Sequence, residues 1–249
     1  MSKMTAQHSN ADSATGTGPA IVCSGLCQTF QQGEEIITGL DQVSITVERG
    51  EFVCLSGPSG SGKTTLLNAM GGLATADSGQ ITLQDQRIDL LSSAARADIR
   101  LHRIGFVFQA YNLVPVLSAR ENVEFVMQMQ GVGATQRRLK SMAILREVGL
   151  AGMEQRRPAQ LSGGQQQRVA VARAIVSDPV LVLADEPTAN LDSNSAKVLM
   201  DLFQSLNRDR DISFVIATHD ERVIAYCNRL ITMSDGKIET DKPHRAAGA

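Results

Sequence analysis

The segment Gly57-Pro-Ser-Gly-Ser-Gly-Lys63-Thr64 decides the fold class of this 249-residue chain. It follows the mostly apolar run Glu51-Phe-Val-Cys-Leu-Ser56, which suits a buried strand. It leads into Lys63-Thr-Thr-Leu-Leu-Asn-Ala-Met70, which suits a helix. A strand, a glycine-rich loop and a helix in this order form a phosphate-binding loop, and the segment fits G-x-x-x-x-G-K-[ST] at every fixed position. The sequence therefore predicts an α/β protein with a nucleoside triphosphate site.

This loop contains the groups that a bound triphosphate needs. Its glycines let consecutive backbone N–H groups face phosphate oxygens, and the start of the next helix adds its dipole. We expect Lys63 to contact the β- and γ-phosphates and the Thr64 hydroxyl to bind Mg²⁺. The alternative is a glycine-rich turn that only happens to precede a helix. The nucleotide-binding residues predicted here are Gly57, Pro58, Ser59, Gly60, Ser61, Gly62, Lys63, Thr64 and Thr65.

Two adjacent carboxylates end a second apolar strand, Val180-Leu-Val-Leu-Ala-Asp185-Glu186. Asp185, at the strand end, is expected to bind the Mg²⁺ opposite Thr64. Glu186 is expected to polarise a water behind the γ-phosphate as a general base. Alone, the pair could equally cap the next helix. The phosphate loop upstream favours the catalytic interpretation.

A third segment, Leu161-Ser162-Gly163-Gly164-Gln165-Gln-Gln-Arg168, precedes a predicted helix. A serine and two glycines at a helix start expose free N–H groups, which make a second anion site. One nucleotide does not need two such sites in one chain, so two copies facing head to tail would each offer this site to the other's γ-phosphate. The alternative, an ordinary serine-capped helix, does not explain the glycine pair.

These three segments together resemble the ABC (ATP-binding cassette) ATPases, and the third resembles their signature sequence. The resemblance covers residues 21–240 and implies further roles. Gln109 matches the glutamine that contacts Mg²⁺ and the attacking water, and His219 matches the histidine that contacts the γ-phosphate and supports Glu186. Asp192 matches the loop between subunits. Phe30 lies where the family places an aromatic that stacks on adenine, although it could also be a core residue.

Within the family, one branch is most similar. Gly105-Phe-Val-Phe-Gln-Ala-Tyr-Asn-Leu-Val-Pro115 and Glu121-Asn-Val123 resemble the ATPases of macrolide-export, lipoprotein-release and cell-division systems. In that branch the ATPase drives a four-helix permease that transmits motion across the membrane rather than passing substrate through a central channel. Ala189 stands where close members often have Gly, a mild departure that affects no catalytic residue.

Patterning along the chain predicts one ABC ATPase domain over residues 20–240, with disordered tails at residues 1–19 and 241–249. Residues 20–51 are β-rich, since Val43-Ser-Ile-Thr-Val-Glu48 alternates strictly. Residues 92–165 are predicted as a helical insert that includes the capping box Ser118-Ala-Arg-Glu121. The expected fold class is α/β, a P-loop NTPase core with an N-terminal antiparallel β-subdomain and an inserted α-helical subdomain.

Composition excludes several classes of protein. The formal net charge is only −2, so no global field attracts nucleic acid or anionic lipid. No apolar stretch approaches the ~20 residues of a transmembrane helix. The four cysteines lack the spacing of a zinc site, so we expect reduced, mostly buried thiols.

The resemblance implies an ATPase that homodimerises around two ATP and Mg²⁺ beneath a separate membrane permease. It would lie peripherally at the cytoplasmic face of the inner membrane, and a periplasmic adaptor could join through the permease. A regulatory ATPase that controls a periplasmic enzyme through a membrane partner is the alternative. A soluble ABC ATPase of DNA repair or translation is disfavoured, because no coiled-coil insert, zinc module or basic patch is present and no nucleic-acid partner is expected.

An apolar cluster around Pro115, formed by Leu113, Val114, Val116 and Leu117, is predicted to dock a short helix of the permease. The alternative is that these side chains pack inside the helical insert.

Overall fold

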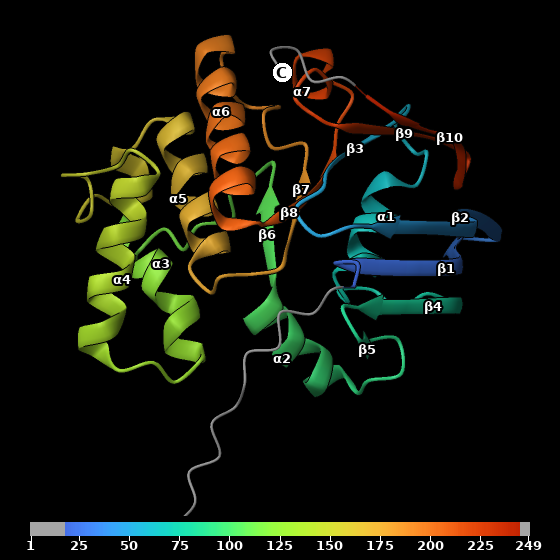
Figure 1. Cartoon of the computed structure of the whole chain (residues 1–249), viewed down its shortest axis with the longest axis horizontal. Coiled ribbons are helices and arrows are strands. Elements are labelled where there is room, and N and C mark those ends of the chain that lie inside the picture. The colour runs from blue at the N-terminus through green and yellow to red at the C-terminus, as the bar shows by residue number, and fades with distance from the viewer. Residues whose placement is uncertain (1–17, 245–249) are drawn as a thin grey trace, which may run out of the picture.

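A six-stranded sheet forms the centre of residues 18–244, the part of the chain that the computed structural model describes (Figure 1). Its strand order is β10-β9-β3-β8-β7-β6. Strands β9, β3, β8, β7 and β6 are parallel to their neighbours, and β10 pairs with β9 in the antiparallel sense. The strands are β3 (Phe52–Ser56), β6 (Ile104–Phe108), β7 (Leu181–Asp185), β8 (Ser213–Ala217), β9 (Arg229–Ser234) and β10 (Lys237–Pro243).

Both faces of this sheet are covered, which is why its strands are nearly continuous apolar runs. Side chains on alternate residues of β8 enter two different cores. Phe214 and Ile216 belong to one, and Val215 and Ala217 belong to the other. Strand β3 divides in the same way. The aromatic rings of Phe52, Phe203 and Phe214 contact one another within the first core.

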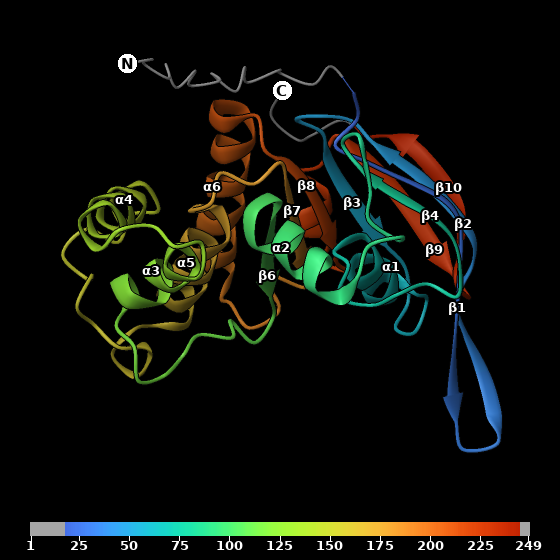
Figure 2. The same cartoon turned by 90° about the horizontal axis from the view of Figure 1, so that it is seen from below.

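A second, antiparallel sheet lies at one end of the molecule, with the order β2-β1-β4-β5 (Figure 2). It consists of β1 (Ile21–Gln32), β2 (Glu35–Val47), β4 (Ser78–Leu83) and β5 (Gln86–Arg87). Helix α1 (Lys63–Met70) is enclosed between the two sheets, and its buried residues join those of β1, β2 and β4 in one core. Helix α2 (Ser93–Arg103) precedes β6.

Helices cover the other face of the central sheet and form the opposite end of the molecule (Figures 1 and 2). Helix α5 packs against β6 and α6, and α3 and α4 pack against α5. Their apolar residues form one continuous core with that face of the sheet. The helices are α3 (Ala119–Met129), α4 (Ala134–Glu147), α5 (Gly163–Ile175) and α6 (Ser193–Arg210), with the 3-10 helix η1 (Pro158–Gln160) before α5 and the short α7 (Glu221–Ile224) after β8.

The predicted α/β fold with its antiparallel β-subdomain and helical insert is confirmed, but one boundary of the insert is wrong. Residues 104–108 form β6, which pairs in parallel with β7 and belongs to the core sheet. The insert therefore begins after Phe108 and not near residue 92. A five-residue apolar run flanked by polar segments has no periodicity of its own, so only its partner strand identifies it.

The C-terminal boundary also shifts. Strand β10 continues to Pro243, so residues 241–243 belong to the sheet and not to the predicted tail. The Arg229 guanidinium anchors this strand by contacting Asp241 and Glu51. A turn at Asp235-Gly236 joins β9 and β10 as a hairpin. Residues 1–17 and 245–249 of the predicted tails lie outside the described residues.

The four cysteines are free thiols, and three of them are buried. Within residues 18–244, no helix is both long enough and apolar enough to span a bilayer.

Candidate functional site

The carboxyl ends of four parallel strands meet at one edge of the central sheet, where open α/β sheets bind their ligands. Strand β3 continues into the phosphate loop, β7 ends at Asp185, and β6 and β8 lead to Gln109 and His219. A cavity of about 610 Å³ lies at this edge. It is lined by Phe30, Ile37, Thr38, Gly39, all nine predicted phosphate-loop residues from Gly57 to Thr65, Gln109, Asp185, Glu186 and His219.

Glycines shape the phosphate loop where backbone approaches backbone. Gly57 has φ 146°, and a Cβ on it would lie 2.2 Å from the Met233 carbonyl oxygen. Gly62 has φ 99°, and its Cβ would lie 2.5 Å from the Gly39 carbonyl oxygen. No L side chain fits at either position. Gly62 precedes α1 without a side-chain cap, so the first N–H groups of that helix keep their capacity to bind an anion.

Lys63 lies under this loop and is nearly buried, with 9% of its surface exposed. Its Nζ donates to the carbonyl oxygens of Gly57 at 2.7 Å and Pro58 at 2.8 Å. The ammonium is therefore held at the centre of the loop, where the cavity receives phosphate oxygens.

Two of the three predicted magnesium ligands, Thr64 and Asp185, are in direct contact. The Thr64 hydroxyl donates to Asp185 Oδ2 at 2.9 Å. The pKa of Asp185 is raised above its ordinary value, chiefly because the carboxyl group is buried. The hydrogen bond from Thr64 lowers this pKa in part, and the neighbouring Glu186 charge raises it. A partly desolvated carboxylate beside a hydroxyl is a set of hard oxygen donors that suits Mg²⁺.

Glu186 is held in place by the strand next to its own. Its backbone has φ 45°, an uncommon value for a non-glycine residue, and its N–H donates to the Ala217 carbonyl at 2.9 Å. His219 Nδ1 lies 2.7 Å from Glu186 Oε1, and the Thr218 hydroxyl donates to Oε2 at 3.0 Å. The carboxylate is thus fixed at the mouth of the cavity by two side chains that follow β8.

Phe30 lines the cavity with 45% of its surface exposed, so it is not a core residue. Its ring lies over Gly39 of β2, where a Cβ would come within 2.4 Å of the ring. The face of an exposed ring beside a phosphate loop is suited to stacking on a purine base. The adenine-stacking role of Phe30 stays a prediction.

The signature segment, Ser162 to Gln165, is outside the residues that line this cavity. Ser162 is exposed and caps α5 in a capping box with Gln165, as each side chain bonds the other's backbone N–H. The Gly163 and Gly164 N–H groups begin the helix and have no intrahelical acceptor. Packing adds a second reason for the glycines, because a Cβ would lie 2.9 Å from the Tyr111 hydroxyl at Gly163 and 3.0 Å from Ser195 Oγ at Gly164.

Asp192 is likewise outside the cavity lining and is the cap of α6. Its Oδ1 accepts from the backbone N–H groups of Asn194 and Ser195, and its Oδ2 accepts from the Ser195 hydroxyl. These bonds hold the pKa of Asp192 below its ordinary value. In this chain, Asp192 and the signature segment therefore do not meet the phosphate loop.

Two polar residues of the site were not predicted from the sequence. Thr218 is buried and bonds Glu186, and its place directly before His219 was the available signal. Gln167 is also buried, and its Nε2 donates to the Pro187 carbonyl at 2.8 Å and the Phe108 carbonyl at 3.4 Å. It ties α5 to the ends of β6 and β7. Nothing in the local sequence distinguishes it from Gln165 and Gln166.

Comparisons with known proteins identify the family. The sequence matches the ABC transporter family over residues 40–189. It is 43% identical to the lipoprotein-releasing system ATP-binding protein LolD of Anaeromyxobacter dehalogenans, over 93% of this chain and 97% of that protein. It is 41% identical to the macrolide export ATP-binding/permease protein MacB of Hyphomonas neptunium, over 94% of this chain. The chain spans only 36% of the length of that MacB relative.

A solved structure shares the fold. The dimeric ATP-binding cassette MJ0796 bound to ADP and Pi is 37% identical, with a TM-score of 0.84 over 91% of this chain and 100% of that one. The chain belongs to the ABC transporter ATP-binding family. It is an ABC ATPase, similar to the LolD and MacB ATP-binding proteins.

Proposed function

We propose that this chain hydrolyses ATP as a homodimer and thereby drives a separate membrane permease of the lipoprotein-release and macrolide-export type. One observation carries this proposal. A single cavity of the chain holds the phosphate loop, two ligands for a metal ion and a base, while the signature segment lies outside that cavity. The names of the relatives support the membrane partner, and the solved MJ0796 dimer supports the assembly.

The predicted site residues that line the cavity have distinct roles in hydrolysis. Phe30 stacks on adenine, and the phosphate-loop N–H groups with Lys63 bind the β- and γ-phosphates. Glu186 accepts a proton from a water behind the γ-phosphate. His219 and Thr218 hold the Glu186 carboxylate for that transfer, and Gln109, which also lines the cavity, orients the water.

Thr64 and Asp185 would hold Mg²⁺, with Gln109 as a further ligand. The 2.9 Å contact between Thr64 Oγ1 and Asp185 Oδ2 already brings two oxygen ligands together. When bound, Mg²⁺ neutralises charge on the phosphate oxygens.

In the proposed dimer, Ser162, Gly163, Gly164 and Gln165 of one protomer face the γ-phosphate held by its partner. Asp192 lies between the subunits, where it shapes the start of α6 by capping it. ADP lacks the phosphate that joins the two halves, so ATP favours the closed dimer and hydrolysis releases it.

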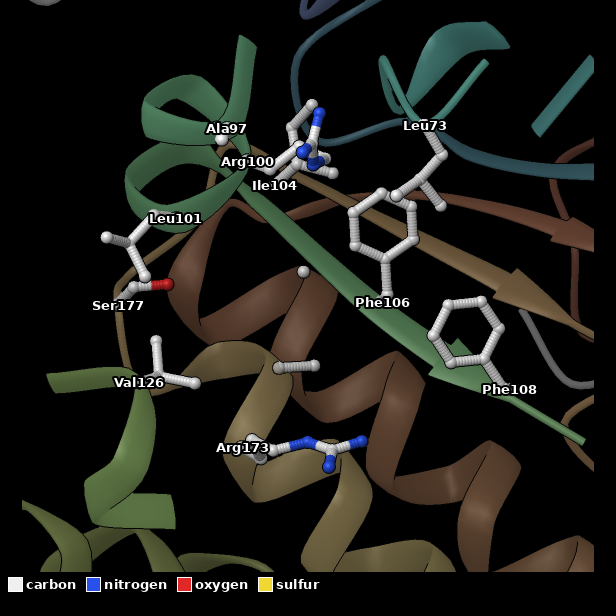
Figure 3. A pocket seen from close by; sticks show the side chains of 12 residues that line it. Leu73, Ala97, Arg100, Leu101, Ile104, Phe106, Phe108, Val126, Arg173 and Ser177 are labelled. Carbon is white, nitrogen blue, oxygen red and sulfur yellow. The ribbon is translucent and has the colours of Figure 1, made fainter. Parts of the chain in front are cut away.

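A groove of about 360 Å³, lined by residues of β6 and of helices α2, α3 and α5, is the proposed permease contact (Figure 3). The rings of Phe106 and Phe108 stack along it at a centroid distance of 5.7 Å. It is mostly apolar and is lined by Leu73, Ala97, Arg100, Leu101, Ile104, Gly105, Phe106, Phe108, Val126, Arg173, Ala174 and Ser177. Its position between the core sheet and the helical insert lets a helix docked there move with both.

This groove differs from the docking surface predicted from the sequence. None of residues 113–117 lines it. Leu113 is half-buried against the core of the insert, and Val116 is 70% exposed. Of these apolar side chains, at least one therefore packs inside the insert and another is exposed. We propose the groove, and not this segment, as the permease contact.

The groove is tested by placing charge in it. Leu73→Glu affects a side chain that is 47% exposed and lines the groove. We expect the variant to retain ATPase activity and to lose co-purification with the permease, because a carboxylate in the groove must lose its water when an apolar helix docks. Leu90→Glu is the matched control, since Leu90 is 74% exposed and does not line the groove. Equal co-purification of both variants would contradict the proposed contact.

The localisation follows from this contact. We propose that the chain lies peripherally at the cytoplasmic face of the inner membrane, held there by the permease.

A further inference from the structure

The turn after Gln109 contains two consecutive residues in the left-handed region. Tyr111 has φ 60° and Asn112 has φ 51°. Asn tolerates this conformation, but a bulky residue such as Tyr adopts it rarely. Such backbone persists only where the surrounding structure holds it. The turn itself contributes the bonds from the Tyr111 N–H to the Phe108 carbonyl and from the Asn112 N–H to the Ala110 carbonyl.

Arg173 of α5 holds both residues of this turn from outside. Its guanidinium donates to the Asn112 carbonyl at 2.5 Å and to the Tyr111 carbonyl at 3.0 Å. The planar fork of an arginine suits two acceptors at adjacent positions, which a lysine cannot bind in the same way. The Arg173 side chain is half-buried, and this burial lowers the pKa of its guanidinium.

The clamped turn connects to the nucleotide side of the chain. Gln109, two residues before Tyr111, lines the cavity, and its carbonyl accepts from Asn190 Nδ2 at 3.1 Å. The Tyr111 hydroxyl lies against Gly163 of the signature segment. Arg173 also lines the groove on the other side of β6, as Figure 3 shows beneath Phe106 and Phe108.

We propose that Arg173 is a positioning residue for ATP hydrolysis, which holds Gln109 at the cavity by clamping the left-handed turn Tyr111-Asn112. It does not line the nucleotide cavity, and it acts only through the backbone between residues 109 and 112. The proposal rests on the proposed role of Gln109. Because one side of the same arginine faces the groove, a helix docked there would contact the clamp directly.

The test begins with steady-state ATPase kinetics of Arg173→Gln. We expect kcat to fall roughly 2- to 30-fold, the range seen for residues that couple sites without touching a ligand. The KM for ATP should change little, because Phe30 and the phosphate loop hold the nucleotide. Arg173→Lys should give an intermediate kcat, since it retains the charge and loses the fork.

A second substitution separates positioning from folding. Asn112→Gly makes one left-handed position free of strain and should leave kcat close to that of the unmodified chain. In the double variant Asn112→Gly with Arg173→Gln, we expect part of the lost kcat to return. A fall in kcat, KM and melting temperature together, with no recovery in the double variant, would show a purely structural arginine and would overturn the proposal.

Arg100 is the matched control. It lines the same groove, its pKa is also lowered by burial, and it donates to a loop carbonyl, that of Gly72, at 2.6 Å. It makes no contact with the turn at residues 109–112, so Arg100→Gln should keep kcat. An equal loss of kcat in Arg100→Gln and Arg173→Gln would also overturn the proposal.

Gln109→Ala distinguishes failure of this inference from failure of the function on which it rests. If Gln109→Ala is slow and Arg173→Gln has unchanged kcat, only the clamp is wrong. If Gln109→Ala itself hydrolyses ATP at the original rate, the proposed role of Gln109 is wrong, and the proposed role of Arg173 is wrong as well.

Discussion

Asp185 and Glu186 are adjacent in the sequence, yet the fold gives their carboxylates different partners. Asp185 contacts Thr64 of the phosphate loop, and Glu186 contacts Thr218 and His219 after β8. The positive φ of Glu186 turns its side chain away from the line of the strand. Asp185 is therefore placed to bind the metal ion, and Glu186 is placed to act on the attacking water.

Substitution of Glu186 separates binding from hydrolysis. Glu186→Gln should bind Mg-ATP normally and hydrolyse it roughly 10²- to 10⁴-fold more slowly, the usual contribution of a positioned general base. Lys63→Ala should instead weaken nucleotide binding, because it removes the ammonium from the loop. Single-turnover hydrolysis and titration with a fluorescent ATP analogue measure the two effects. Turnover of Glu186→Gln near that of the unmodified chain would refute the assignment of the base.

The Thr218 hydroxyl is expected to position Glu186. Thr218→Val keeps the shape and removes the bond to Oε2, so kcat should fall roughly tenfold, the lower end of what a hydrogen bond to a charged group contributes. Thr188→Val is the control, since Thr188 is equally buried and its hydroxyl lies 3.5 Å from Asp220 and contacts no catalytic group. The same loss of kcat in both variants would mean that Thr218 acts through general stability.

At the scale of elements, the β9–β10 hairpin packs against the phosphate loop. The Gly236 N–H donates to the Ser61 carbonyl at 3.2 Å, and its carbonyl accepts from the Asp41 N–H at 2.9 Å. Gly39, which seats Phe30, lies against the same turn. The phosphate loop, the strand beneath the Phe30 ring and the hairpin therefore meet at three glycines, Gly39, Gly62 and Gly236.

This contact predicts a distal effect on ATP affinity. In Gly236→Ala the new Cβ would lie 3.1 Å from the Gly39 carbonyl oxygen. Overpacking of this kind costs about 1–3 kcal/mol, and we expect the KM for ATP to rise roughly fivefold at little change in kcat. Gly131→Ala is matched in backbone, as both glycines have φ 77°, and nothing lies within 4 Å of its Cβ. An unchanged KM in Gly236→Ala would show that the hairpin does not shape the site.

At the scale of the whole molecule, the separation of the two anion sites requires a second copy of the chain. Glu186→Gln protein should run as a dimer with ATP and mostly as a monomer with ADP, as measured by light scattering. The reason is that only the γ-phosphate bridges the phosphate loop of one protomer and the signature segment of its partner. The same mass in both nucleotides would contradict this bridging role.

Complementation tests whether the site is shared. Lys63→Ala disables the phosphate loop, and Ser162→Arg fills the signature segment at an exposed position. Each variant alone should be inactive. In a mixed dimer one composite site carries both changes and the other carries neither, so an equal mixture should recover activity, up to about a quarter of the original turnover. Activity no greater than the sum of the two separate variants would argue against shared sites.

The sequence by itself determined the phosphate loop, the two carboxylates and the signature segment. Each is a contiguous run whose conformation depends on local chemistry, such as glycines at φ angles that exclude side chains and a serine that caps the next helix. The same local rules predicted the capping box that begins α3.

Only the tertiary structure decided which separate segments meet. Strand β6 is defined by its pairing with β7 and by the close approach of α5 to Gly105, where a Cβ would lie 2.5 Å from the Ala174 carbonyl oxygen. The groove, the Arg173 clamp and the separation of Asp192 from the cavity all follow from that arrangement. Side chains far apart in the chain become neighbours through strand order and helix packing, and no local pattern encodes these.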